Sequence, residues 1–194
     1  MQEYATPAIV LDIVDTGESD ARVFLFTKAV GRVAARARSL RKIISKLAGH
    51  LQPGNIVEVR LVEKKGFQVT DALKVRPVAA TSNMRETIAI LQMIKQYAQD
   101  YHPDQALWDL IERGELYGRP FLTALGFDPE HARCSRCEKI RPSYFIIKDT
   151  VYQCRDCLNH GYAGYVQNDR MKEVLAVPSS KAIQKFQQLQ HGLS

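Results

Sequence analysis

Apolar and polar positions alternate with a period of two over the first 75 residues, a pattern typical of β-strands with one buried face. Turn signals at Gly17, Pro53-Gly54 and Lys65-Gly66 divide this region. The predicted strands are Tyr4–Val14, Arg22–Thr27, Gly31–Arg38, Ile56–Glu63 and Phe67–Leu73, with a short helix at Leu40–Ala48 after the third. Five short strands with a helix after the third favour a small barrel of the OB type, and an SH3-like barrel would give much the same pattern.

A helical period replaces the strand period from about residue 82 onward. In Met84–Tyr101 the apolar residues Ile88, Leu91 and Ile94 recur on one face. Four further helices are predicted: one from Pro103 to the residues before Gly114, and others at Pro120–Leu125, Asp169–Ala176 and Ser180–Gln190. The fold class is therefore α+β, with a five-stranded OB-type barrel at residues 1–78 and a helical domain at residues 79–194.

The composition and charge indicate the cellular compartment in which the chain works. It has 194 residues, with 27 lysines and arginines against 21 aspartates and glutamates, a formal charge of +6. No apolar run reaches the roughly 20 residues that span a bilayer, and the N-terminus lacks the positive charge of a secretory signal. We therefore expect a cytoplasmic protein with no membrane partner. Thiols stay reduced in that compartment, so the cysteines favour a metal site over disulfides.

The four cysteines form two pairs, Cys134-x-x-Cys137 and Cys154-x-x-Cys157, with sixteen residues between them. Each pair places two thiolates on one tight turn, and two such turns can surround one Zn²⁺ with four sulfurs. Strand-like segments at Ser143–Lys148 and Val151–Gln153 predict a hairpin between the pairs. We expect a zinc ribbon at residues 131–160 holding one structural Zn²⁺, since four thiolates leave no open coordination position. Two disulfides, a redox pair and an iron–sulfur cluster are the alternatives.

A basic run with no acidic residue lies between residues 28 and 46. A strand at Gly31–Arg38 would place Arg32, Arg36 and Arg38 on its solvent face, so we expect an unpaired track of guanidinium groups that phosphates can follow. The residues predicted to bind DNA are Arg32, Arg36, Arg38, Arg41, Lys42 and Lys46. The aromatic candidates for stacking on bases are Phe24, Phe26 and Phe67. A merely solvated charged face is the alternative.

The segment Leu125-Gly126-Phe127-Asp128-Pro129 leads into the first cysteine pair. Together with the small barrel, its basic strand and the helical domain, it resembles the bacterial recombination mediator family RecO, over roughly Ile9–Leu73 and Leu125–Cys157. The resemblance implies a non-enzymatic DNA repair protein of the nucleoid that binds single- and double-stranded DNA and anneals complementary strands. It also implies the partner RecR, and work with single-strand-binding protein and the recombinase RecA, which it helps to load. It assigns DNA contacts to Arg32, Arg36, Arg38, Arg41 and Lys42, and zinc binding to Cys134, Cys137, Cys154 and Cys157.

Two other classes of function remain open from the residues alone. An RNA-binding protein of ribosome assembly or translation would share the barrel, the ribbon and the electrostatics. An enzyme would need a recognisable catalytic motif, and the sequence has no Gly-x-x-x-x-Gly-Lys-Ser/Thr phosphate loop, no His-Glu-x-x-His and no nucleophile elbow. We therefore expect no catalysis and no small-molecule substrate.

Overall fold

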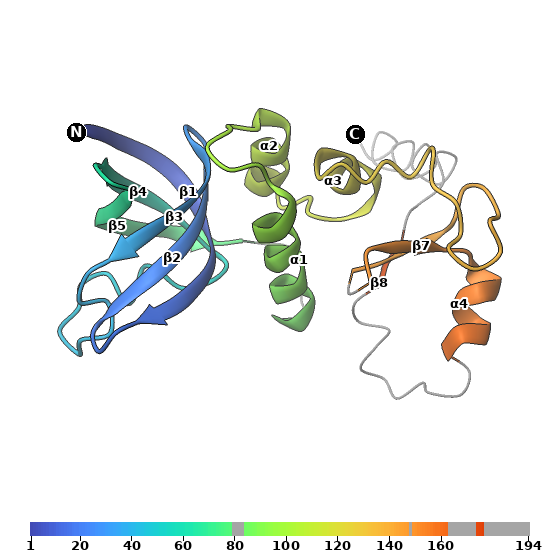
Figure 1. Ribbon diagram of the computed structural model, residues 1–194, viewed down its shortest axis with the longest axis horizontal. Coiled ribbons are helices and arrows are strands. Elements are labelled where there is room, and N and C mark those ends of the chain that lie inside the picture. Colours follow the sequence, from blue (N-terminus) through green and yellow to red (C-terminus); the bar gives the residue numbers. More distant parts are fainter. Residues whose placement is uncertain (79–83, 148, 163–173, 177–194) are drawn as a thin grey trace, which may run out of the picture. The chain divides into compact units, whose positions relative to one another are not determined.

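The computed structural model of the chain describes residues 1–78, 84–147, 149–162 and 174–176 (Figure 1). By its internal packing the chain divides into two compact units, Met1–Leu116 and Tyr117–Ser194. Over the described ranges, no helix combines the length and the apolar character needed to cross a membrane. The domain division predicted at residues 78 and 79 stays a prediction.

Five strands form the N-terminal barrel, as the alternating pattern predicted. They are β1 (Gln2–Thr16), β2 (Asp20–Thr27), β3 (Gly31–Ala37), β4 (Asn55–Glu63) and β5 (Phe67–Pro77). Their pairing closes in the order β1-β2-β3-β5-β4, and every pair is antiparallel except β3 with β5. Both β1 and β5 are longer than predicted. The first part of β1, Gln2–Ile9, pairs with β4, and β5 pairs with β4 from Phe67 to Pro77.

The barrel interior is filled by one side of each alternating strand. On β3, Val33, Ala35 and Ala37 are buried, whereas Ala34 and Arg36 are exposed. The small alanines of β3 share the core with larger residues from the other strands, among them Leu25, Leu61 and Phe67. Mixing small and large side chains in this way lets the narrow interior be filled without voids. The predicted inward and outward faces of β3 are confirmed.

The β3–β4 loop (residues 38–54) contains turns and no helix, so the helix predicted at Leu40–Ala48 is wrong. The start of the loop is held by the hairpin between β1 and β2. The Ser39 N–H donates to the Asp20 carboxylate at 2.8 Å, and the Arg41 N–H donates to the Ser19 carbonyl at 3.0 Å. Leu40, between them, is buried in the barrel core. These tertiary contacts override the helical tendency of the segment.

The helix α1 (Met84–Tyr97) packs beside the barrel and ends before the predicted Tyr101 (Figure 1). It stops because the following residues pair with the first part of β3. The Arg32 N–H donates to the Gln99 carbonyl at 3.4 Å, and the Tyr101 N–H donates to the Arg32 carbonyl at 3.1 Å. The chain after α1 is therefore a partner of the barrel and not a continuation of the helix.

The helix α2 (Gln105–Arg113) follows at the position that the sequence predicted. The carboxylate of the N-cap Asp104 accepts the Leu107 N–H at 2.9 Å, and Gly114 ends the helix with a left-handed φ of 73°. Its Trp108 stacks on Phe26 of β2 with ring centroids 6.5 Å apart, and both rings are buried. This contact joins the helices of the first unit to the outer surface of the barrel.

The second unit begins with α3 (Gly118–Ala124) and holds a small antiparallel sheet in the order β7-β6-β8. The strands are β6 (Tyr144–Ile146), β7 (Val151–Gln153) and β8 (Val174–Ala176), and α4 (Arg155–Tyr162) lies between β7 and β8 in the sequence. The hairpin of β6 and β7 is the one predicted, although β6 is shorter. A helix was predicted across β8, but these three residues pair with β6. The predicted helix at residues 180–190 lies outside the described residues.

The segment after α3 packs against this sheet and explains part of the motif that precedes the cysteines. Gly126 has a φ of +87°, which turns the chain out of α3. Phe127 then lies 5.1 Å from Phe145 of β6, measured between ring centroids, and its carbonyl accepts the Tyr152 hydroxyl at 2.8 Å. The Leu-Gly-Phe sequence thus places an aromatic side chain on the hairpin that separates the cysteine pairs.

The turn at Gly31 gives a test of how closely the barrel and the segment after α1 are fitted. A Cβ atom on Gly31 would lie 2.1 Å from the His102 carbonyl oxygen, and the φ of this residue is +76°. We expect Gly31→Ala to lower the free energy of unfolding by about 2–4 kcal/mol, from overpacking together with backbone strain. Urea unfolding of the purified chain measures the change.

Gly17→Ala is the matched control, because Gly17 has a φ of +73° and nothing within 4 Å of its Cβ position. It should carry only the backbone strain, about 1–2 kcal/mol. Equal costs for the two substitutions would contradict the close approach at His102.

Candidate nucleic-acid interface and metal centre

Arg32, at the start of the basic run, faces the chain after α1 and not open water. Its Nε lies 2.7 Å from Oδ1 of Asp100, and its Nη1 donates to the Lys95 carbonyl. The Arg32 side chain has a relative exposure of only 23%. These two contacts engage two of the five N–H donors of the guanidinium group and hold it against the chain after α1.

Arg36 and Arg41 lie beside carboxylates of the hairpin between β1 and β2. Arg36 binds Oδ2 of Asp20 through Nη2 at 2.6 Å and through Nε at 3.0 Å. Arg41 places its Nε 3.2 Å from Asp15, and its Nη1 donates to the Gly17 carbonyl at 3.1 Å. Both arginines therefore help to fix the start of the β3–β4 loop, although the Arg36 side chain remains 60% exposed.

Asp20 is the group on which these contacts converge. The backbone N–H of Ser39 lowers the pKa of Asp20 most, and the hydrogen bond from Arg36 and the charges of Arg36 and Arg38 lower it further. The carboxylate is thus held in its charged form by one backbone donor and two guanidinium groups.

The structure changes the picture of the basic track. The expectation that Arg32, Arg36 and Arg38 are all unpaired is wrong for the first two, because Asp100 and Asp20 reach them from distant parts of the sequence. The basic run at residues 28–46 contains no acidic residue, and only the folding of the chain brings these two aspartates next to its arginines. The DNA-binding role of the six predicted residues stays a prediction.

Three of the six predicted cations remain available in the β3–β4 loop. Arg38, Lys42 and Lys46 are exposed. Within the described part of the chain, none of the three has an ion pair or a side-chain hydrogen bond. Lys42 and Lys46 also lie in a segment, residues 38–50, that contains no acidic residue. These three side chains make the loop the most plainly cationic part of the barrel that a polyanion could reach.

The aromatic side chains proposed for base stacking are buried or already in contact with other groups. Phe26 is buried against Trp108, and Phe67 is buried in the barrel core. Phe24 lies under the ammonium group of Lys95, which is 4.0 Å from the ring centroid. The sequence showed that these rings lie on strands but could not show that the two helices would cover Phe24 and Phe26.

The four cysteines come together in the second unit. Their Sγ atoms all lie within 4.8 Å of one another, and those of Cys137 and Cys154 are 3.6 Å apart. A tetrahedron of sulfurs around Zn²⁺ with bonds of about 2.3 Å has edges of roughly 3.8 Å. All four cysteines are free thiols in the structure, which argues against the two disulfides considered as an alternative. The cluster can therefore hold a metal ion.

Short hydrogen-bonded turns bring each cysteine pair into position. In the first pair, the Glu138 N–H donates to the Cys134 carbonyl at 2.9 Å, and Glu138 adopts a φ of 57° that completes the turn. In the second pair, Cys157 lies in the first turn of α4, and its N–H lies 3.4 Å from the Cys154 sulfur. The start of α4 was not predicted from the sequence. A helix N-terminus favours negative charge on a nearby thiolate.

The protonation of the cluster differs from one cysteine to another. Burial raises the pKa of Cys134, but hydrogen bonds from the backbone of Cys154, Cys137 and Arg136 outweigh it and lower the pKa to about 6. Hydrogen bonds with the side chains of Cys137 and Cys154 raise the pKa of Cys157 to about 12. The thiolate of Cys134 is thus favoured while the thiols of Cys137 and Cys157 are held in their neutral form, because neighbouring negative sulfurs repel one another unless a cation lies between them.

Comparison with known proteins finds a family model and several DNA repair proteins that are similar to this chain. The family model described as "Recombination protein O N terminal" matches residues 1–79. A DNA repair protein RecO of Myxococcus xanthus is 32% identical over 120 residues, which cover 58% of this chain and 48% of the relative. A DNA repair protein RecO of Dehalococcoides mccartyi is 25% identical over 179 residues, covering 81% of this chain and 71% of the relative. The chain thus spans about half the length of the first relative and more of the second.

The cysteine cluster predicts bound metal. The purified chain should contain about one divalent metal ion, and Cys134→Ser should lose it because the remaining three sulfurs leave the coordination shell incomplete. Elemental analysis of metal per chain measures the ratio. Ser135→Ala is the control, since Ser135 is exposed and adjacent to the same turn. Unchanged metal content in Cys134→Ser would contradict the site.

The lowered pKa of Asp20 predicts a pH-dependent contribution to stability. A carboxyl group whose pKa is lower in the folded chain stabilises it above the unfolded pKa, which is near 3.8, and this contribution is lost as the pH falls through the folded value. Asp20→Asn keeps an oxygen acceptor for Ser39 but loses the charge beside Arg36. The variant should therefore be less stable at pH 7 and should lose less stability between pH 5 and pH 3 than the parent.

Thermal unfolding at a series of pH values measures this difference. Glu18→Gln, an exposed position in the same hairpin, is the control and should follow the parent. Parallel pH profiles for the parent and Asp20→Asn would contradict the role of the Asp20 charge.

Proposed function

We propose that the chain is a member of the RecO family of DNA repair proteins and that it works as a non-enzymatic DNA-binding recombination mediator. In this proposal it binds single- and double-stranded DNA, anneals complementary strands and helps RecR to load RecA in the cytoplasm, at the nucleoid. The observation that carries the proposal is the acid-free cationic loop on a barrel that matches the RecO N-terminal family model.

We propose that the barrel is of the OB type. The closed order β1-β2-β3-β5-β4, with β3 parallel to β5, supports this assignment over the SH3-like alternative. OB barrels receive oligonucleotides on the face of strands 2 and 3 and on the adjoining loops. Here the segment after α1 occupies the start of β3 through Arg32, so the free part of this face lies at the end of β3, next to the β3–β4 loop.

The phosphate contacts are proposed for the cations that the structure leaves unpaired. Arg38, Lys42 and Lys46 would each contact the backbone of a strand, with Arg36 adding a fourth because its side chain is largely exposed beside Asp20. Arg32 and Arg41 would act indirectly, since their ion pairs hold the surface on which the other four lie. Four contacts of this kind carry no base readout, so binding would be independent of sequence.

Annealing follows physically from such a surface. Two complementary strands repel each other through their phosphates, and a protein that neutralises phosphates of one strand lowers the repulsion felt by the second. No covalent step is involved, so the proposed activity needs no nucleotide. Proteins that bind elsewhere on the chain, RecR and single-strand-binding protein among them, would recruit the strand or remove its coating.

We further propose that the cysteine cluster holds one structural Zn²⁺ and that the surrounding residues form a zinc ribbon. Cys134, Cys137, Cys154 and Cys157 would bind the ion, and its chemistry there would be that of a cross-link between two turns. Support comes from the donor set, four sulfurs within 4.8 Å of one another, and from the hairpin of β6 and β7 between the two pairs. Metal binding and folding of such a small module are coupled.

The DNA-binding surface is tested by removing two of its cations. For a single strand with four phosphate contacts, the logarithm of affinity should fall with the logarithm of salt with a slope of about −3, and Lys42→Ala with Lys46→Ala should reduce the slope by about 1.4. At 0.1 M salt the double variant should bind on the order of twentyfold more weakly. Fluorescence anisotropy with a labelled oligonucleotide measures both quantities.

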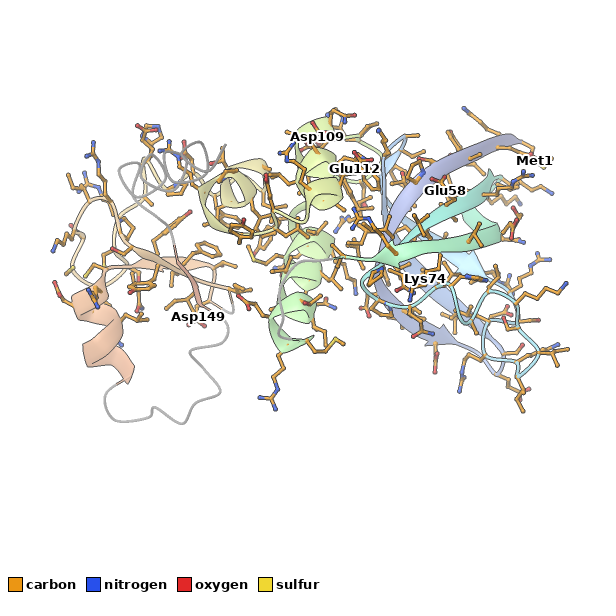
Figure 2. The ribbon with its side chains drawn as sticks, turned by 180° about the vertical axis from the view of Figure 1, so that it is seen from behind. Met1, Glu58, Lys74, Asp109, Glu112 and Asp149 are labelled. Atoms are coloured by element: carbon orange, nitrogen blue, oxygen red, sulfur yellow. The ribbon has the colours of Figure 1, made fainter. Side chains whose placement is uncertain are left out.

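Lys28→Ala with Arg113→Ala is the matched control. It removes the same charge, but Lys28 is paired with Glu112 of α2, and Arg113 with Glu115. Figure 2 labels Glu112. Equal losses in the two double variants would show that net charge and not the loop binds DNA. Preference for RNA over DNA of equal length would favour the translation-related alternative, and annealing that requires ATP would overturn the mediator.

A further inference from the structure

The tip of the β3–β4 loop carries two isoleucines that the fold leaves in water. Ile43 has a relative exposure of 105% and Ile44 of 87%, the two highest values among the large hydrophobic side chains of the described residues. Isoleucine is one of the residues most often buried in folded proteins. Two neighbouring isoleucines in full contact with solvent therefore need an explanation beyond the packing of the barrel.

The backbone at this point makes the pair more unusual. The Ser45 N–H donates to the Lys42 carbonyl at 2.9 Å, so Ile43 and Ile44 are the two central residues of a hydrogen-bonded turn. Central turn positions favour glycine, proline, asparagine, aspartate and serine, and two isoleucines depart from that preference. A departure from the local preference is expected where a residue serves a function.

The position of the turn is set by contacts at the start of the loop. Leu40 is buried in the barrel core, Ser39 bonds to Asp20, and Arg41 bonds to the hairpin between β1 and β2. The two isoleucines follow within four residues of this anchor. They are therefore held at a defined place on the barrel surface and not at the end of a free chain.

The charges around the tip indicate what kind of partner it meets. Residues 38–50 contain Arg38, Arg41, Lys42 and Lys46 and no acidic residue. Two carboxylates at the start of the loop, Asp15 and Asp20, are already paired with Arg41 and Arg36. An apolar pair surrounded by cations is complementary to a ligand with an anionic outside and an apolar interior, and a stacked nucleic-acid strand has this character.

We propose that Ile43 and Ile44 form a wedge that inserts between neighbouring bases of the DNA strand whose phosphates are held by Lys42 and Lys46. This inference rests on the proposed DNA-binding function and adds how the bases are contacted. Isoleucine is among the apolar side chains that unstack base steps in this way. The wedge would also supply a base contact in place of Phe26 and Phe67, which are buried, and of Phe24, whose ring is in contact with the Lys95 ammonium group.

Insertion has a consequence for pairing. Stacking in a single strand restricts how its bases can turn, and separating one step lets the two flanking bases rotate toward a second strand. A second, complementary strand can then begin to pair at that step while cations of the loop reduce its repulsion. The wedge would therefore act at the start of annealing and not in binding alone.

The test uses a single-stranded oligonucleotide containing 2-aminopurine, whose fluorescence rises when it is unstacked. Binding of the parent chain should raise the signal. Ile43→Ala with Ile44→Ala should abolish the rise. It should also weaken binding roughly tenfold, because the variant no longer buries the isoleucine side chains when it binds DNA. The salt dependence should stay that of the parent, because no phosphate contact is removed.

Leu73→Ala with Val75→Ala is the matched control, since these aliphatic residues of β5 are 61% and 56% exposed and lie outside the loop. It should leave the fluorescence rise intact. Thermal unfolding should show both double variants folded like the parent, because the removed side chains are exposed.

The outcomes separate the wedge from the function on which it rests. If the parent binds DNA and the isoleucine variant gives the same fluorescence rise, the wedge is wrong and the DNA-binding function stands. If the parent does not bind DNA, both fall. Loss of binding to anionic lipid vesicles or to a second copy of the chain, with the DNA signal unchanged, would assign the isoleucines to those partners and overturn the wedge.

Discussion

The position of the β3–β4 loop depends on the carboxylate of Asp20. It accepts the backbone N–H of Ser39 and binds the guanidinium group of Arg36, so it joins the hairpin between β1 and β2 to the start of the β3–β4 loop. Once that start is fixed, Leu40 enters the core and the following cations and isoleucines are displayed on the surface. The Asp20 carboxylate thus fixes the start of a basic segment that would otherwise tend to form a helix, and the segment becomes a loop with a defined position.

Much of the fold was predictable because it depends on local periodicity. Alternation identified all five strands of the barrel and the inward side of β3, and the glycine and aspartate signals placed α2. The spacing of Cys134, Cys137, Cys154 and Cys157 was enough to predict that their sulfurs meet. In each of these cases the residues that decide the structure lie close together in the sequence or repeat a simple spacing.

The errors have a common physical origin in contacts between distant residues. Arg32 meets Asp100, 68 positions further along the chain, and no inspection of the basic run could reveal this acid. The helix expected at Leu40–Ala48 lost to hydrogen bonds from the neighbouring hairpin. Phe24 and Phe26 were candidates for stacking on bases, but Lys95 contacts the Phe24 ring and Trp108 stacks on Phe26. Tertiary contacts decided each outcome against the local preference.

The pairing of Arg32 with the chain after α1 also affects how other proteins can approach the barrel. A strand that leaves backbone groups unpaired along its side can accept an extended peptide from another molecule. The N–H and carbonyl of Arg32 are already used by Gln99 and Tyr101, and further along β3 the same side pairs with β5 at Ala35–Ala37. A partner seeking to extend the sheet would first have to displace the protein's own segment, so recognition at this barrel falls to side chains and loops.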